Sequence, residues 1–493
     1  MTHGHGAAPR PSLTRLLQPS SVAVVGATDT AVAARTVASI VDLQVETFLV
    51  NPGHPTVFGR PTTPSLASIG RPVDVVFSLL SAARTVQVAE EAADAGAGGL
   101  VVVAVGFAEM GAEGAELQRR LAAAAARADM PVVGPNGVGY IDVTRGLELT
   151  SLPRFGRRPG GVSVVAHSGA LLEAFASCAC RSGGVGLNLM ISAGNEAVTD
   201  MADYLDYLAD DPDTRVIVLA LEKIRRPAAF FAAARKARLA GKPVIALKLG
   251  RTGRSQAMAR SHTGTVTGDS WVYEAAFRQA GIITAAEVDE LVDRAQFLEQ
   301  LPPHKWSAVR GLAVLTGTGG FASLAADLSA DEHVDVPAAG RLDRWIGEVV
   351  PGAQFANPLD ATGFVVIRPE IWERVIDTYA AAPEFDSFIY LSQFAPWDQR
   401  SKRFSDVFTA AAQRSAKPYF VSPLAGPAAD WVDEYRSRQG VAVGNGLRGS
   451  LRALRAMAQF VRGRPDAAVQ SPGTVPATGR PPDGWAKTGP ARC

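Results

Sequence analysis

The chain of 493 residues has few cysteines, no long apolar run and almost no excess of either charge. The number and spacing of Cys178, Cys180 and Cys493 offer neither a disulfide framework nor a zinc site, and we expect no metal site in this chain. No apolar stretch reaches about 18 residues without a charge or a breaker, so we expect no membrane span. Residues 1–10 lack the apolar segment of a signal peptide, which favours a cytoplasmic location.

The charge balance also excludes several kinds of partner. Lysine and arginine number 49 and acidic residues 48, so the chain has no global field that would attract nucleic acid or anionic lipid. With 47% hydrophobic and 20% charged residues, the chain is expected to be globular. Its length is too great for one hydrophobic core and suits about three domains.

Short β-branched runs alternate with Ala-rich helical stretches, a pattern typical of parallel α/β units. The chain is expected to divide into a first α/β domain over 12–150, two successive flavodoxin-like domains over 151–300 and 307–461, and a disordered tail over 463–493 that is rich in proline and glycine. The expected strands are Ser21 to Val25, Thr47 to Val50, Val73 to Leu79, Leu100 to Val105, Pro131 to Val133, Val162 to Ala166, Leu187 to Ser192, Val216 to Leu221, Pro243 to Lys248, Gly311 to Leu315, Phe388 to Leu391 and Pro418 to Val421.

The first expected strand leads into the turn Gly26-Ala27-Thr28, where a doubly wound sheet normally presents backbone N–H groups to a phosphate. The three-glycine dinucleotide fingerprint is absent, which argues against nicotinamide but leaves another phosphate-bearing cofactor open. An ordinary strand-to-helix turn is the alternative. Carboxyl ends of parallel strands converge on one crevice, and the other strand ends supply further candidate cofactor contacts, namely Asn51, Pro52, Leu80, Ser81, Gly106, Phe107 and Asn136.

In the second domain the expected strand Val162 to Ala166 is followed by His167-Ser168-Gly169-Ala170 and an apolar helix. The helix N-terminus at Ser168, Gly169 and Ala170 would attract an anion such as phosphate. The alternative is that Ser168 is only an N-cap.

His262 is flanked by small residues in a segment expected to be an exposed loop, just after the strand Pro243 to Lys248. Its neutral imidazole would be available as a nucleophile toward a phosphoryl donor. Glu222, at the end of the strand Val216 to Leu221, could accept a hydrogen bond from one ring nitrogen and leave the other free. A solvated bystander histidine is the alternative.

These segments resemble, in order, the NDP-forming acyl-CoA synthetases, which include the ADP-forming acetyl-CoA synthetases and, more distantly, succinyl-CoA synthetase. The resemblance covers roughly residues 12–460 and rests on Ser261-His262-Thr263-Gly264, Val165-Ala166-His167-Ser168-Gly169-Ala170, Gly194-Asn195, Leu205 to Asp213, Leu221-Glu222 and Asn357-Pro358-Leu359-Asp360.

The resemblance implies a Rossmann-like CoA-binding domain followed by two succinyl-CoA synthetase-like flavodoxin domains. It implies that His262 receives phosphate, that Glu222 stabilises phosphohistidine, and that Ser168, Gly169, Ala170, Thr263 and Gly264 hold the phosphate. The implied reaction joins a small carboxylic acid to CoA through an acyl phosphate, with ATP converted to ADP and phosphate. ATP and Mg²⁺ would bind an ATP-grasp β subunit, and the chain would act in a hetero-oligomer.

The chain departs from the family pattern at three places. Ala31 to Ala34 stand where the family commonly has more glycine, Gly137 stands where a cysteine is common, and His167 replaces a common glutamine. His167 either tunes the phosphate site or is a packed residue with local partners. Two other functions therefore stay open, a CoA or acyl-CoA binding protein without turnover and an acyl-CoA-dependent lyase or transferase on the same domains.

Overall fold

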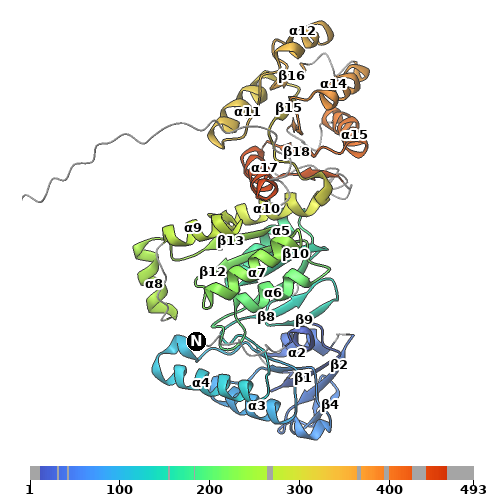
Figure 1. The fold of residues 1–493 in the computed structure, drawn as a ribbon. Coiled ribbons are helices and arrows are strands. Elements are labelled where there is room, and N and C mark those ends of the chain that lie inside the picture. Colours follow the sequence, from blue (N-terminus) through green and yellow to red (C-terminus); the bar gives the residue numbers. More distant parts are fainter. Residues whose placement is uncertain are drawn as a thin grey trace, which may run out of the picture.

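The computed structural model describes residues 12–29, 33–41, 44–153, 156–182, 184–263, 270–362, 368–392, 399–424 and 440–463. They form three α/β units that follow one another along the chain, coloured blue, green and yellow to red in Figure 1. The mostly parallel sheets confirm the expected fold class. The predicted tail, apart from Gly463, lies outside the described residues.

The first unit is built on a seven-stranded sheet in the order β3-β4-β2-β1-β5-β6-β7, in which only β3 and β4 pair antiparallel. Its strands are β1 (Ser21–Val25), β2 (Glu46–Val50), β3 (Thr56–Val57), β4 (Arg60–Thr63), β5 (Val75–Ser78), β6 (Leu100–Val102) and β7 (Val132–Val133). Its helices are α1 (Thr14–Leu17), α2 (Ala33–Val41), η1 (Ala67–Ile69), α3 (Ala82–Asp94), η2 (Ala108–Met110) and α4 (Ala112–Arg127).

The second unit has a seven-stranded sheet in the order β14-β13-β12-β10-β11-β8-β9. Its strands are β8 (Gly139–Asp142), β9 (Leu147–Thr150), β10 (Pro159–Ala166), β11 (Leu187–Ser192), β12 (Val216–Leu221), β13 (Val244–Lys248) and β14 (Ile283–Ala285). Its helices are α5 (Gly169–Ser182), α6 (Met201–Asp210), α7 (Pro227–Leu239), α8 (Gly253–Thr263), α9 (Ser270–Ala280) and α10 (Val288–Gln300).

The third unit follows the short helix η3 (Pro303–Lys305) and has a parallel sheet in the order β16-β15-β17-β18-β19. Its strands are β15 (Leu312–Thr316), β16 (Leu359–Asp360), β17 (Ser387–Ser392), β18 (Tyr419–Pro423) and β19 (Val441–Val443). Its helices are α11 (Gly319–Asp331), α12 (Gly340–Val349), α14 (Pro369–Ala381), α15 (Gln399–Arg414) and α17 (Leu447–Arg462).

The hairpin of β8 and β9 lies before residue 151 in sequence but belongs to the second sheet. β8 pairs antiparallel with β11, and β9 pairs antiparallel with β8. The boundary between the first two units therefore lies before β8, whereas the sequence predicts a boundary after residue 150. Both strands bury most of their side chains, so pairing with β11 removes the hairpin's apolar side chains from water.

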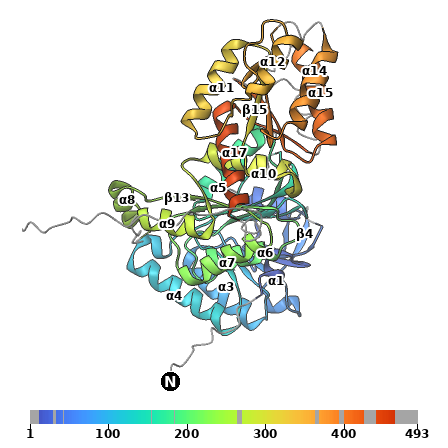
Figure 2. The same ribbon diagram turned by 45° about the horizontal axis from the view of Figure 1, so that its top comes forward.

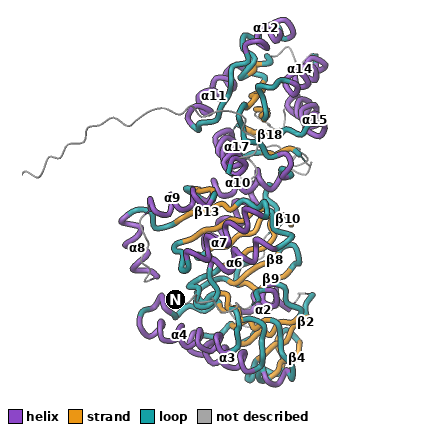
Figure 3. Tube along the Cα trace, viewed as in Figure 1, coloured by secondary structure: helices purple, strands orange, loops and turns teal. Residues whose placement is uncertain are grey.

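Central strands of the second sheet are buried along their whole length because helices cover both faces, as Figure 3 shows. Val164 of β10 packs into the core with α5 and α10, and its neighbour Val165 packs into the core on the other face with α6 and α7. This alternation follows from the two-residue period of a strand.

The second and third units share a core through α10 and α17, which lie side by side in Figures 1 and 2 and contact each other. Phe297 of α10 stacks on Phe420 of β18 with ring centroids 5.1 Å apart. Arg452 of α17 pairs with Glu290 of α10 at 2.6 Å. These contacts fix the third unit against one end of the second.

Candidate active site

The carboxyl ends of β1, β2, β5, β6 and β7 lie along one edge of the first sheet because these strands are parallel. This edge brings together the turns that the sequence singles out, which contain Gly26, Ala27, Thr28, Asn51, Pro52, Leu80, Ser81, Gly106, Phe107 and Asn136. Their shared position supports one extended ligand site, while contact of each residue with a cofactor stays a prediction.

The turn after β1 is shaped by its neighbours. The side-chain amide of Asn51 donates to the carbonyl oxygen of Ala27 at 2.7 Å and accepts from the N–H of Gly53 at 2.8 Å. Gly26 has a φ of 82°, and a Cβ there would stand 2.6 Å from Cδ2 of Leu80. Asn51 and Leu80 therefore hold the turn in place, and only glycine fits at residue 26.

Ser81 provides an open helix N-terminus at the same edge. It is the exposed N-cap residue of α3, its hydroxyl makes no capping hydrogen bond, and the first turn contains no acidic residue. The free N–H groups and the positive end of the helix dipole suit an anion. These residues therefore fit a phosphate-bearing ligand such as CoA.

The Glu109 carboxylate holds the backbone of Gly106 and Phe107 by hydrogen bonds. Both backbone N–H groups donate to Oε1 of Glu109, at 2.6 and 3.1 Å. Burial opposes ionisation of Glu109, but hydrogen bonds from Asn195 and from the backbone lower its pKa. The ring of Phe107 is fully buried in the first core and offers a ligand no side-chain surface.

Asn195 connects the carboxyl edges of the first two sheets. It follows β11, and its side chain accepts from Asn136 at 3.1 Å and donates to Gln118 at 3.0 Å. Gly194 precedes it with a φ of 57°, and a Cβ there would stand 2.1 Å from the carbonyl oxygen of Pro135. The carboxyl edges of the first two sheets are therefore in direct contact at Gly194 and Asn195.

Ser168 begins α5 at the carboxyl end of β10. The hydroxyl of Ser168 accepts from the N–H of Leu171 at 3.4 Å. Ser168 therefore acts as the N-cap of α5, which is the alternative role that the sequence leaves open. Gly169 packs against Val138, since a Cβ there would stand 2.7 Å from Cγ1 of that residue. Capping leaves the other first-turn N–H groups of α5, including that of Ala170, available to an anion.

Glu222 stands beside Ser168 because β10 and β12 are adjacent and parallel. The backbone N–H of Glu222 donates to Nδ1 of His167 at 2.9 Å. Nε2 of the same ring lies 3.0 Å from Oε1 of Glu196, and both side chains are buried. His167 is therefore a packed residue with local partners, and it links Glu222 to a buried carboxylate.

Lys248, at the end of the neighbouring strand β13, adds a buried cation. Burial lowers the pKa of its ammonium group to about 8, and the Glu222 carboxylate opposes that shift. Its Nζ lies 4.5 Å from the centre of the Tyr273 ring. From the sequence, Lys248 is only the last residue of an expected strand, because burial of a lysine has no local sequence signal.

The segment that carries His262 is a helix rather than the expected loop. Residues 253–263 form α8, and His262 lies in its last turn. Residues 254–260 contain no glycine, proline or β-branched residue, which favours a helix. α8 contacts η2 of the first unit, and Figure 1 shows it reaching from the second unit toward the first.

Only the backbone of Ser261, His262 and Thr263 is described, and Gly264 lies outside the described residues. The pairing of His262 with Glu222 and the phosphate contacts of Thr263 and Gly264 therefore stay predictions. Within the described ranges, no group of three or more His, Cys, Asp or Glu side chains is arranged to hold a metal ion. The same residues include no helix long and apolar enough to cross a membrane.

Two family models match the first two units. Residues 20–141 match a CoA binding domain, and residues 159–298 match a succinyl-CoA ligase like flavodoxin domain. The acetate–CoA ligase [ADP-forming] II subunit alpha of Pyrococcus furiosus is 31% identical over 69% of this chain and 73% of the relative. The chain belongs to the NDP-forming acyl-CoA synthetase family.

Other members of the family extend the comparison. A trans-feruloyl-CoA synthase from an unknown prokaryotic organism is 32% identical over 74% of this chain and 52% of that protein. The dinucleotide-forming acetyl-coenzyme A synthetase 1 of Ca. Korarchaeum cryptofilum, solved with phosphate and ADP, matches with a TM-score of 0.82 and 28% identity, over 94% of this chain and 100% of that one. The chain spans about half the length of several curated relatives that it matches.

Proposed function

We propose that this chain is the CoA-binding, phosphohistidine-carrying part of an ADP-forming acyl-CoA synthetase. The observation that carries the proposal is the carboxyl edge of the second sheet. There the N-terminus of α5 and Glu222 lie side by side, and β13 leads into the helix that contains His262. The CoA binding domain directly before this sheet supplies the thiol substrate at the adjoining edge.

In the proposed chemistry, one phosphoryl group passes from a donor to His262 and from His262 to the acid. A ring nitrogen of His262 attacks phosphorus, the P–O bond to the donor breaks, and Glu222 accepts a hydrogen bond from the other ring nitrogen. The N–H groups at Ser168 and Gly169 stabilise the phosphoryl oxygens. The acid and phosphohistidine exchange the group to form an acyl phosphate, and the CoA sulfur then displaces phosphate; every step is reversible.

The nucleotide is proposed to bind an ATP-grasp β subunit together with Mg²⁺, which gives a hetero-oligomer. Relatives named as alpha subunits support this partner, and longer relatives are compatible with a fused arrangement. Magnesium would neutralise charge on the transferred phosphoryl group. The cytoplasm stays the proposed location on the sequence argument alone.

The function is tested by turnover of this chain together with the proposed ATP-grasp β subunit. Formation of acyl-CoA is measured with ATP, CoA and either acetate or ferulate, the acids suggested by the names of relatives. His262→Ala should abolish turnover, whereas His304→Ala, at an exposed position in η3, should leave it unchanged. Equal turnover in both variants refutes the proposal.

Calorimetry of the chain with CoA separates the alternatives. CoA binding without acyl-CoA formation from any acid would favour the binding protein without turnover. Cleavage or transfer of an acyl group that does not consume ATP would favour the lyase or transferase.

A further inference from the structure

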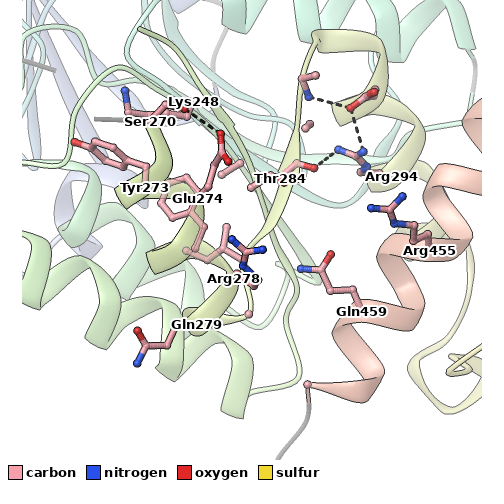
Figure 4. Close-up of a pocket in the computed structure, with 18 of the residues that line it drawn as sticks. Lys248, Ser270, Tyr273, Glu274, Arg278, Gln279, Thr284, Arg294, Arg455 and Gln459 are labelled. Atoms are coloured by element: carbon pink, nitrogen blue, oxygen red, sulfur yellow. Dashed lines mark hydrogen bonds and ion pairs between the residues drawn. The ribbon is translucent and has the colours of Figure 1, made fainter. Parts of the chain in front are cut away.

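An open pocket of about 750 Å³ lies between α9, β14, α10 and the end of α17, and it reaches the carboxyl end of β13 at Lys248. Figure 4 shows side chains of the second and third units facing each other across it. Six basic side chains line the pocket, namely Arg238, Lys248, Arg251, Arg278, Arg294 and Arg455. The chain as a whole has a net charge of only +1, so this is a local concentration of positive charge.

Carboxylates offset only part of this charge. Glu274 and Glu290 line the same pocket. Glu290 is occupied by Arg294 at 3.0 Å and by Arg452 at 2.6 Å. Glu274 accepts from the hydroxyl of Ser270 at 2.9 Å.

Four of the arginines therefore face the pocket without a carboxylate partner. Within the described part of the chain, no ion pair joins Arg238, Arg251, Arg278 or Arg455 to an acidic side chain, and Arg455 makes only a 3.4 Å hydrogen bond to the carbonyl oxygen of Glu332. Unpaired guanidinium groups that face one another repel, so the arrangement favours a bound anion.

Arg294 shows how strongly these cations influence one another. Burial lowers the pKa of its guanidinium group, and the positive charges of Arg452 and Arg455 add to that effect against the opposing Glu290. Its Nε is buried and has no hydrogen-bond partner among the described residues. In Figure 4, Arg455 extends from α17 toward Arg294 on α10, so the two like charges come from different units.

We propose that this pocket binds a small polyanion that carries two or more phosphate groups. Guanidinium groups form paired, charge-assisted hydrogen bonds with phosphate oxygens, and arginines from several directions favour a multiply charged ligand over a single anion. The volume lies within the range of small-molecule sites. Such a ligand would join α9, which follows the His262 segment, to α17 of the third unit.

This binding site does not depend on the synthetase activity, so it is tested on the full chain alone. Calorimetry with inorganic pyrophosphate should show one saturable site per chain. The double variant Arg278→Ala and Arg455→Ala, which removes one exposed arginine from each side, should weaken binding by roughly tenfold or more. Arg414→Ala, at an exposed arginine on α15, is the matched control and should bind as the parent does.

The proposal is overturned by no binding of pyrophosphate, by equal binding by the double variant, or by equal weakening by the control. Circular dichroism of each variant checks that it is folded. Citrate serves as a second probe, and much tighter binding of citrate than of pyrophosphate would contradict the preference for phosphate. Calorimetry with CoA should give the same affinity for parent and double variant, whereas a parallel loss would make the pocket part of the CoA site.

Discussion

Replacing His167 tests how much its contacts with Glu222 and Glu196, next to the proposed phosphate site, contribute to stability. In His167→Leu, the Glu222 N–H loses the acceptor that lies 2.9 Å away in the parent. A donor left unsatisfied in a buried position costs about 1–3 kcal/mol, and the lower end applies here because Glu222 is half-buried. The fully buried Glu196 also loses the ring nitrogen 3.0 Å from its carboxylate, although Oε1 keeps the N–H of Met201 at 2.7 Å. We therefore expect the free energy of unfolding to fall by at least about 2 kcal/mol.

The measurement is urea unfolding combined with hydrogen exchange of the Glu222 amide. His167→Leu should lower the unfolding midpoint and speed exchange of that amide. His167→Gln is the matched control, because its side chain keeps both an acceptor and a donor. We expect it to recover at least half of the loss. Parent-like stability and parent-like exchange in His167→Leu would show that His167 does not hold the Glu222 N–H.

The remaining predictions concern Asp200 and Lys248. Asp200 caps α6 and binds Arg226 at 2.5 Å; burial opposes its ionisation, but Arg226 and the N–H of Ala202 lower its pKa. The stabilisation by ionised Asp200 is present above the unfolded pKa of about 4 and is lost as pH falls through the lower folded pKa. In urea unfolding, Asp200→Ala should therefore lower the free energy of unfolding by about 2–3 kcal/mol at pH 7 and by less in acid. An equal loss at both pH values would contradict this expectation. Because burial lowers the pKa of Lys248 to about 8, the folded chain holds fewer protons than the unfolded chain between pH 8 and about 10.4. The contribution of Lys248 to the free energy of unfolding should rise by up to about 3 kcal/mol across that window, and Lys248→Met should remove the rise. If the free energy of unfolding of the variant depends on pH as that of the parent does, Lys248 is not buried as described.

The sequence predicts the sheet strands well where helices cover both faces. The expected bounds of β1, β11 and β12 match the structure because a parallel, fully buried strand is a continuous run of apolar residues. The placement of strand ends along one edge also follows from the βαβ order alone. The gathering of the candidate turns could therefore be predicted without coordinates.

The features that the sequence does not predict depend mostly on contacts between distant parts of the chain. The hairpin of β8 and β9 joins the second sheet through pairing with β11, and neither strand carries a signal of its partner. Glu196 is found beside His167 only when β11 and β10 are placed side by side. The small residues that flank His262 predict a loop, whereas residues 254–260 have good helix propensity and extend α8 to Thr263.

The proposed function rests on phosphate transfer to His262. The parent chain and the proposed ATP-grasp subunit are incubated with γ-labelled ATP, and the acid-labile label on this chain is located by mass spectrometry. The proposed function predicts label on His262, none in His262→Ala, and a shorter-lived label in Glu222→Gln, while His304→Ala labels as the parent does. Unchanged acid-labile labelling in His262→Ala would contradict it.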